Sequence, residues 1–204
     1  MGFYDERILP HLIALAMRHG ELVDYRRRVA SAARGRVLEI GIGSGLNLPF
    51  YSPDVTQVIG LDPSKRLLEM ARGHAQRASL PITLLSASAE GIPLDDYSVD
   101  DAVMSWTLCS VSQVALVLSE IRRVLKPSGS LFFVEHGKAP DPSVRTWQDR
   151  LTPIWKHVAG GCHLNRDVKH LVLEAGFDIP DLGTGYMRGP RPLTFMFEGR
   201  ARPR

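Results

Sequence analysis

A glycine-rich loop that directly follows a short apolar run is the feature that most restricts the fold of this chain. The run covers 36–40, and glycine stands at positions 41, 43 and 45. The length and β-branched content of the run predict a buried strand, which the glycines end. Because glycine has no β-carbon, such a loop can turn sharply and bring its backbone close to a ligand.

Similar apolar runs alternate with amphipathic segments along the rest of the chain. Further strands are predicted over 57–61, 82–85, 99–104, 130–135, 177–182 and 193–198. Helices are predicted over 5–19, 21–33, 64–75, 112–125, 143–158 and 166–175. We therefore expect an α/β fold with a doubly wound, seven-stranded, mostly parallel sheet and an N-terminal helical cap. The last two strands can pair as a hairpin, which would leave an antiparallel strand at the edge.

Two acidic residues stand at the ends of the first two predicted strands. Glu39 precedes the glycines, and Asp62 follows Gly41 by 21 residues. Position 46 is leucine, so the loop lacks the glycine spacing of a dinucleotide fingerprint. A carboxylate near the loop would repel a diphosphate and attract an ammonium group, and Asp62 could accept hydrogen bonds from both hydroxyls of a ribose. An adenosine with a cationic amino-acid tail meets these requirements, which describes S-adenosylmethionine.

Four segments resemble motifs of class I S-adenosylmethionine-dependent methyltransferases, which have a Rossmann-like fold. They are Val37–Gly45, Gly60–Ser64, Ser86–Pro93 and Val124–Gly129, and they span roughly residues 35–135. The third resembles the stretch that closes over adenine, although Ser88 stands where that family commonly has an acid. The resemblance implies that the cofactor is bound by Glu39, Gly41, Ile42, Gly43, Gly45, Asn47, Asp62, Pro63, Ser64, Ser88, Ala89, Glu90, Trp106 and Thr107.

Three further segments resemble, more narrowly, the methyltransferase-like proteins of animals that methylate alkyl thiols. They are Trp106–Val111, Val134–His136 and Gly161–Arg166. Those animal proteins carry an N-terminal membrane-anchoring segment. Here the apolar stretch 8–17 is interrupted by a proline and a histidine, so it predicts neither a membrane span nor a signal peptide. This resemblance implies a small-molecule thiol as the methyl acceptor.

The expected reaction makes few demands on the protein, because a sulfonium methyl group is already activated and is displaced in line. A thiol with a pKa of roughly 8.5 is a few per cent thiolate at neutral pH, and a base or cation would raise that fraction. His136 follows a predicted strand, at the edge where ligands of such sheets bind, so it is the first candidate for this role; packing under a loop is the alternative. His163 is the second candidate. Arg166 could supply a fixed positive charge or pair at the surface.

Aromatic and cysteine side chains are candidates for the acceptor pocket. Trp147 and Trp155 are eight residues apart in a predicted helix and can share one face, and Tyr4 lies on a helix that could close as a lid. Cys109 follows a predicted strand near the expected methionine end of the cofactor, where we expect it to pack as a small buried residue. Because Cys162 lies 53 residues away and no C-x-x-C motif occurs, we expect no metal site.

Composition points to a single folded domain. Of 204 residues, 44% are hydrophobic and 23% are charged, which is typical of a globular rather than a disordered chain. We expect a helical cap over 1–34, a cofactor-binding half over 35–135 and a substrate-side half over 136–204. Two cysteines are too few for a disulfide scaffold, and a reducing cytoplasm is the simplest location for them.

Other functions remain open at this point. The net charge of +3 and the pI near 9.0 could suggest a nucleic-acid substrate. The fourth predicted strand is not followed by an Asn/Asp-Pro-Pro-aromatic stretch, however, so no nucleic-acid partner is expected. C- or O-methylation of a quinone-like or phenolic molecule fits the first motifs equally, as does N-methylation of a small amine or phospholipid. A module that binds S-adenosylmethionine or S-adenosylhomocysteine without turnover is the non-enzyme alternative.

Overall fold

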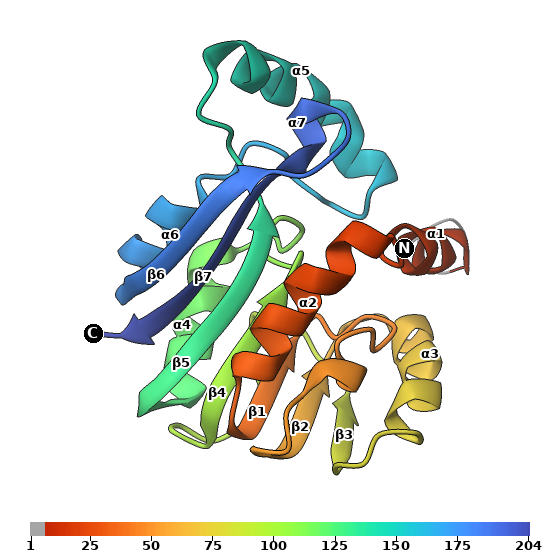
Figure 1. The fold of residues 1–204 in the computed structure, drawn as a ribbon, viewed down its shortest axis with the longest axis vertical. Coiled ribbons are helices and arrows are strands. Elements are labelled where there is room, and N and C mark those ends of the chain that lie inside the picture. Colours follow the sequence, from red (N-terminus) through yellow and green to blue (C-terminus); the bar gives the residue numbers. More distant parts are fainter. Residues whose placement is uncertain (1–6) are drawn as a thin grey trace.

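The computed structural model describes residues 7–204, in which helices lie on both faces of a seven-stranded sheet (Figure 1). The strands are β1 (Gly35–Ile40), β2 (Val55–Leu61), β3 (Ile82–Leu85), β4 (Val99–Ser105), β5 (Leu125–His136), β6 (Phe177–Tyr186) and β7 (Phe195–Pro203). The helices are α1 (Leu9–Ala16), α2 (Gly20–Ala32), α3 (Lys65–Ala75), α4 (Val114–Val124), α5 (Pro142–Val158), α6 (Val168–Glu174) and α7 (Arg191–Thr194), with a 3-10 helix η2 at Leu48–Phe50. In Figure 1, α2 lies in front of the sheet, and α4 and α6 lie behind it.

The strand order places the glycine loop at the centre of the sheet. The order is β3-β2-β1-β4-β5-β7-β6, and β1 to β5 run parallel. The direction of winding reverses at β1, which pairs with both β2 and β4. This confirms the predicted doubly wound sheet. Ligands of such sheets bind beyond the carboxyl ends of the strands at the point of reversal, so the loops after β1 and β4 mark the expected site.

The antiparallel strand does not lie at the edge, where the hairpin pattern placed it. β7 lies between β5 and β6 and is antiparallel to both. The burial of the two strands explains the order, because β7 carries the buried Phe195, Phe197 and Ala201, whereas β6 is mostly exposed or half-buried. The apolar strand therefore takes the inner position, and the polar strand forms the edge.

Two apolar clusters cover the two faces of the sheet. Leu38 of β1 belongs to a cluster that includes Val117 of α4 and Val172 of α6. The next residue along β1, Val37, belongs to a second cluster with Val29 of α2. Because successive side chains of a strand point to opposite faces, a strand covered on both sides carries apolar side chains on both, as Val37, Leu38 and Ile40 show.

The helix boundaries differ from the prediction mainly at the N-terminus. α1 is shorter than the predicted 5–19, and residues 5 and 6 lie outside the described residues. Pro10 stands in the first turn of α1, where its missing N–H has no helical partner to lose. The four-residue α7 was not predicted, because a single turn is too short to show periodicity.

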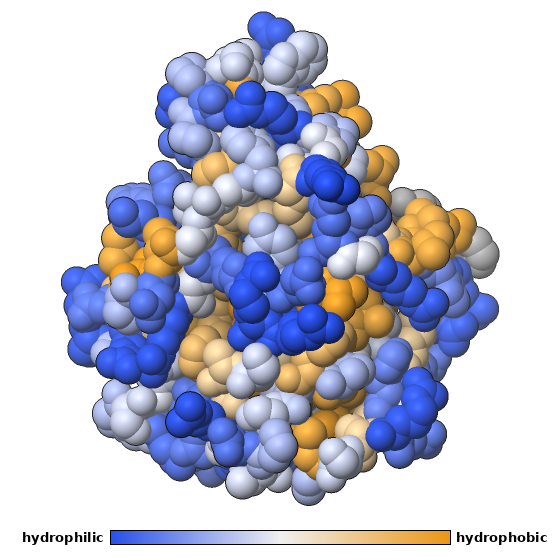
Figure 2. All heavy atoms as spheres, in the orientation of Figure 1, coloured by the Kyte–Doolittle hydropathy of each residue, from blue (hydrophilic) through white to orange (hydrophobic). Residues whose placement is uncertain are grey.

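Exposed apolar side chains gather on two helices. Leu12 and Leu15 are exposed on α1, and Trp147 and Ile154 are exposed on α5. Figure 2 shows hydrophobic residues over α1, at the right of the view. Within residues 7–204, no helix combines the length and the apolarity that crossing a bilayer requires.

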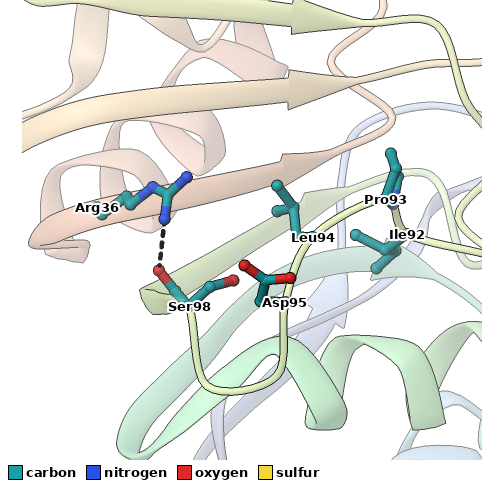
Figure 3. A pocket seen from close by; sticks show the side chains of 6 residues that line it. All are labelled: Arg36, Ile92, Pro93, Leu94, Asp95 and Ser98. Carbon is teal, nitrogen blue, oxygen red and sulfur yellow. Dashed lines mark hydrogen bonds between the residues drawn. The ribbon is translucent and has the colours of Figure 1, made fainter.

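A small cavity lies near the amino ends of the strands, at the opposite end of the sheet from the glycine loop. Its volume is about 270 Å³, and Figure 3 shows the side chains that line it. Arg36 at the start of β1 donates a hydrogen bond to the carbonyl oxygen of Ser98 at 3.1 Å. Because both residues stand where strands begin, this cavity is separate from the predicted site.

Candidate functional site

A pocket of about 650 Å³ opens beyond the carboxyl ends of the central strands. Its walls come from the loops after β1 to β4, the end of β5, α5 with the segment that follows it, and α1, which contributes Leu9, Ile13 and Ala14. The volume lies in the usual range for cofactor and small-molecule sites. The sequence-predicted residues that line this pocket are Gly41, Ile42, Gly43, Asp62, Pro63, Ser64, Ser88, Ala89, Glu90, Trp106, Thr107, Cys109, His136 and Trp155.

The three loop glycines have different roles, although all have positive φ angles. A β-carbon on Gly41 would lie 2.2 Å from Oγ1 of Thr107, so the loop can pack against the segment after β4 only without one. Gly43 lines the pocket and has no comparable steric conflict. A β-carbon on Gly45 would contact Ala71 of α3 at 3.3 Å. Gly45, predicted to bind the cofactor, instead packs the loop against α3.

The carboxylate of Asp62 joins the glycine loop to the loop after β2. Its Oδ2 accepts a hydrogen bond from the backbone nitrogen of Gly43 at 3.0 Å, and its Oδ1 accepts one from Ser64 at 2.8 Å. Burial raises the pKa of Asp62, while these two backbone hydrogen bonds act in the opposite direction. A carboxylate has about four acceptor positions, so Asp62 keeps capacity for hydroxyl donors of a ligand.

Glu39 lies beneath the loop rather than in the pocket wall. Its carboxylate accepts hydrogen bonds from Nδ2 of Asn47 and from the hydroxyl of Tyr51, both at 2.9 Å. Asn47 in turn accepts a hydrogen bond from the buried Arg26 at 2.9 Å. Burial raises the pKa of Glu39 to about 7, although these neighbours favour its charged form. Glu39 and Asn47, both predicted to bind the cofactor, therefore support the loop from behind.

The loop after β3 supplies a polar section of the wall. Ser88 and Glu90 face each other, with Oγ of Ser88 3.3 Å from the carboxylate of Glu90. Glu90 also accepts hydrogen bonds from the hydroxyl of Ser112 and the backbone nitrogen of Gln113. The hydrogen bond from Ser112 lowers the pKa of Glu90. These contacts tie the predicted adenine segment to the start of α4.

The segment after β4 adopts a strained turn at the pocket wall. Trp106 has a φ of 51°, which is uncommon for a residue with a bulky side chain. Its ring lies 4.8 Å from the guanidinium carbon of Arg26 and packs edge-on against Tyr25. Strained backbone of this kind persists where neighbouring groups hold it, and it occurs often at functional sites.

The fully buried carboxylate of Glu135 holds the next turn. It accepts hydrogen bonds from the backbone nitrogens of Thr107 at 2.7 Å, Leu108 at 2.9 Å and Cys109 at 3.4 Å. Burial raises the pKa of Glu135 well above its usual range. Sequence reasoning missed this residue, although an acid within a buried apolar strand, as at Glu39, is a signal that could have identified it.

Three reactive side chains meet at the end of β5. Nε2 of His136 lies 2.9 Å from Sγ of Cys162, and Cys109 lies beside both. Cys109 is buried, as expected from the sequence. The hydrogen bond from Cys162 and the charge of His136 hold the pKa of Cys109 well below its usual range. Burial by itself lowers the pKa of His136, but the Cys109 thiolate outweighs it and the net shift is upward. Cys162 was not among the predicted site residues.

His163 and Arg166 lie behind this group instead of lining the pocket. Arg166 donates hydrogen bonds to the carbonyl oxygens of Leu108 and of Val111, the latter at 2.7 Å. The backbone nitrogen of His163 donates to the carbonyl oxygen of Cys109 at 2.8 Å. Both residues therefore fix the loop after β4, and neither was expected in this supporting position.

The prediction that Trp147 lines the pocket is wrong. Trp147 is 55% exposed, whereas Trp155 lines the pocket and donates from Nε1 to Sγ of Cys162 at 3.3 Å. Eight residues correspond to about 2.2 helical turns, so the two side chains point in directions about 80° apart. Tyr4, also predicted to line the pocket, lies outside the described residues.

The donor set suits S-adenosylmethionine better than a dinucleotide. Gly41 and Gly43 allow close backbone approach, and Asp62 presents a carboxylate that a diphosphate would avoid. Apolar side chains of α1 and Leu61 cover other parts of the wall, as an adenine ring requires. Gly41, Gly43 and Asp62 are thus the residues that would hold this cofactor.

The chain is similar in sequence to known methyltransferases. A family model described as a methyltransferase domain matches residues 38–133. Thiol S-methyltransferase TMT1B of Rattus norvegicus is 36% identical over 145 residues, which is 69% of this chain and 59% of that protein. Phosphatidylethanolamine N-methyltransferase of Cereibacter sphaeroides is 36% identical over 116 residues, which is 54% of this chain and 57% of that protein. The chain thus spans less than two thirds of the length of these relatives.

A solved structure agrees in fold along nearly the whole chain. A methyltransferase from Thermotoga maritima has a TM-score of 0.70 at 21% identity, and the match covers 97% of this chain and 99% of that one. The region matched by the family model contains the glycine loop, Asp62 and Trp106. Residues 38–133 therefore form a methyltransferase domain of the class I, S-adenosylmethionine-dependent type.

Proposed function

We propose that this protein transfers the methyl group of S-adenosylmethionine to the sulfur of a small thiol. The observation that carries the proposal is the composition of one end of the pocket. Cys109, His136, Trp155 and Cys162 line that end, so it presents sulfur, imidazole and aromatic groups. These groups match a soft, partly apolar acceptor, and they share one pocket with the cofactor residues.

The acidic side chains of the pocket support a thiol over an amine. An amine must be neutral when it attacks, and a carboxylate or carbonyl group beside it would orient it. The two acidic residues that line the described pocket are Asp62 and Glu90, on the loops after β2 and β3. Asp62 supports the glycine loop through the backbone nitrogens of Gly43 and Ser64, and its remaining acceptor positions face the cofactor end of the pocket in this proposal. Among the described residues, the end around His136 therefore has no acidic side chain in its wall to orient an amine, which favours a thiol.

The sulfonium of S-adenosylmethionine supplies an activated methyl group, so the protein has to place the acceptor, exclude water and favour the thiolate. Side chains of α1 cover the pocket from one side, which reduces the access of water to it. His136 is the polar side chain nearest to the sulfur groups, and it can take or stabilise the charge that develops there. Effective positioning alone can account for a large share of such a rate enhancement.

A second candidate is methylation of the amine of a phospholipid headgroup. One relative with 36% identity over 116 residues is a phosphatidylethanolamine N-methyltransferase. Exposed Leu12 and Leu15 on α1 lie near the pocket and would favour an amphipathic substrate. This candidate requires an acidic or carbonyl group at the acceptor end, which the sulfur-lined wall does not offer as readily.

An acceptor panel tests the two candidates directly. The full chain would be incubated with S-adenosylmethionine and equal concentrations of alkyl thiols, amines, phenols and phosphatidylethanolamine vesicles, and release of S-adenosylhomocysteine would be measured. We expect turnover with thiols and a fall of tenfold or more in the Asp62→Ala variant. Turnover with amines alone would contradict the proposal. Cofactor binding with no turnover on any acceptor class would favour a binding module.

A further inference from the structure

The three reactive side chains at the end of β5 come from distant parts of the chain. Cys109 lies on the loop after β4, His136 ends β5, and Cys162 lies between α5 and α6. Each offers one atom that can bind a metal ion, and these atoms all lie within 4.8 Å of one another. The spacing of the cysteines predicted no metal site, but the fold brings together ligands that are far apart in sequence.

The distances among these atoms are close to those of a tetrahedral zinc site. Zinc binds thiolate sulfur at about 2.3 Å and imidazole nitrogen at about 2.0–2.1 Å, which separates its ligand atoms by about 3.5–3.8 Å. The separation of Nε2 of His136 and Sγ of Cys162 is 2.9 Å, so these atoms would move apart by about 0.6 Å. Every pair can reach the tetrahedral separation by shifts of about 1 Å or less.

A polar group lies beside each of the two sulfur atoms. Nε1 of Trp155 donates a hydrogen bond to Sγ of Cys162 at 3.3 Å, and Oγ of Ser110 lies 3.5 Å from Sγ of Cys109. Such donors stabilise metal-bound sulfur and orient it. Neither cysteine forms a disulfide. Without a cation, two buried thiolates would repel each other, so a divalent ion would neutralise the group.

The ligand types select the ion. Thiolate and imidazole are soft or borderline ligands, which bind zinc in preference to magnesium or calcium. All three residues also line the pocket, so a bound ion would face it. Three protein ligands with one position open to a substrate cavity are typical of catalytic rather than structural zinc sites.

We propose that Cys109, His136 and Cys162 bind a single Zn²⁺ ion that keeps one coordination position open to the pocket. A second consequence rests on the proposed function. An acceptor thiol that enters the open position forms a zinc–sulfur bond and releases its proton to solvent, because a coordinated thiol is deprotonated outright. The ion would then generate the thiolate near neutral pH, with His136 as its ligand.

Metal binding by the full chain tests the site without any methyl acceptor. The protein, purified without a histidine tag and freed of metal with a chelator under reducing conditions, would be titrated with Co²⁺ alone. We expect about one ion per chain, a sulfur-to-cobalt charge-transfer band and the intense visible bands of tetrahedral cobalt, all lost when Zn²⁺ is added. Absence of the charge-transfer band, or octahedral cobalt spectra alone, would overturn the proposal.

Variants assign the ligands. Cys109→Ser, Cys162→Ser and His136→Asn should each weaken Zn²⁺ binding by tenfold or more, and the cysteine variants should also weaken the charge-transfer band. His170→Asn, at an exposed histidine on α6, is the matched control and should bind Zn²⁺ as the native chain does. Thermal unfolding of the metal-free proteins shows whether each variant is folded. If folded variants keep native Zn²⁺ affinity, the ligand assignment is wrong.

The outcome for the metal is separable from the outcome for the proposed function. A chain that methylates thiols equally well with and without the chelator, and binds no Co²⁺, would overturn the zinc site and leave the thiol proposal standing. A chain that binds about one Zn²⁺ but methylates no thiol would overturn the thiol proposal and leave the zinc site standing. A Cys109–Cys162 disulfide that forms readily in the presence of excess Zn²⁺ would also count against the site, because coordination protects thiolates from oxidation.

Discussion

The carboxylate of Asp62 accepts a hydrogen bond from the backbone nitrogen of Gly43 at 3.0 Å, so the end of β2 directly supports the loop at the end of β1. The same carboxylate lines the pocket. One side chain thus shapes the glycine loop and is available to a ligand. Changes at Asp62 should therefore affect cofactor affinity and stability together.

Replacing Asp62 with alanine should raise the dissociation constant of S-adenosylmethionine at least tenfold, which corresponds to about 1.4 kcal/mol. The change removes a ligand acceptor and leaves the backbone N–H groups of Gly43 and Ser64 without partners, so unfolding should also become easier by about 1–3 kcal/mol. Calorimetric titration and urea unfolding measure the two effects. Asp62→Asn keeps an acceptor oxygen and should lose less stability. Unchanged affinity in both variants would contradict the assignment.

Gly41→Ala should destabilise the protein more than Gly43→Ala. Both glycines have positive φ, which costs an alanine roughly 1–2 kcal/mol. Only at Gly41 would the new β-carbon also lie 2.2 Å from Oγ1 of Thr107. Gly91→Ala is the control, because a β-carbon there meets nothing within 4 Å. Urea unfolding ranks the three variants, and equal losses at positions 41 and 43 would show that the steric conflict relaxes freely.

Much of the fold follows from local patterns in the sequence, which is why β3 was predicted at its observed bounds of 82–85. The glycine loop and Asp62 were also found this way, because each stands at the end of an apolar run. The group around His136 was not, because Cys109 and Cys162 reach it through the path of the loops that follow β4 and α5. Periodicity carries no information about that path, and separation along the chain says little about distance in the fold.

The supporting residues of the site were harder to predict than the residues that line it. Tyr51, which directly follows η2, donates to Glu39, and Arg26 of α2 donates to Asn47. No local motif marks either residue. Glu39 itself looked like a ligand residue because it adjoins the glycine loop in sequence. In a strand, however, successive side chains point to opposite faces, so a neighbour in sequence can lie behind the pocket.

Deleting residues 1–18 should weaken cofactor binding, because Leu9, Ile13 and Ala14 of α1 form part of the pocket wall. We expect a rise of several-fold in the dissociation constant of S-adenosylmethionine, since the deletion opens the pocket to water. Calorimetric titration measures the change, and Leu12→Ala, at an exposed position of α1, is the control. An affinity equal to that of the full chain would rule out a covering role for α1.

Stability should fall as pH rises from about 4.5 to about 7, in part because of Glu39. Burial raises the pKa of this carboxyl from 4.5 to about 7, so between these values the folded protein keeps a proton that the unfolded chain has lost. The raised pKa of Glu39 contributes at most about 3 kcal/mol to the free energy of unfolding. This contribution is fully present below pH 4.5 and is lost as the pH rises to about 7. Asp62 and Glu135 also have raised pKa values, so the total slope is not specific to Glu39.

The difference in unfolding free energy between the native protein and Glu39→Gln isolates this residue, because the other carboxyl groups contribute equally to both. We expect the native protein to lose stability relative to the variant across this pH range. Glu174→Gln, at an exposed carboxylate on α6, is the control. Parallel pH profiles for the native protein and Glu39→Gln would show that Glu39 is charged throughout the range.

Arg166→Ala should destabilise the loop after β4 and, through it, the position of Cys109. The guanidinium donates to the carbonyl oxygens of Leu108 and Val111, and its removal leaves both without this partner, at a cost of about 1–3 kcal/mol. Arg166→Lys keeps the charge but not the paired geometry, so it should recover only part of the loss. Urea unfolding, with Arg72→Ala on the exposed face of α3 as the control, measures the stability, and the rate of Cys109 alkylation reports the loop. If lysine restores both fully, the positive charge of Arg166 matters and its hydrogen-bond geometry does not.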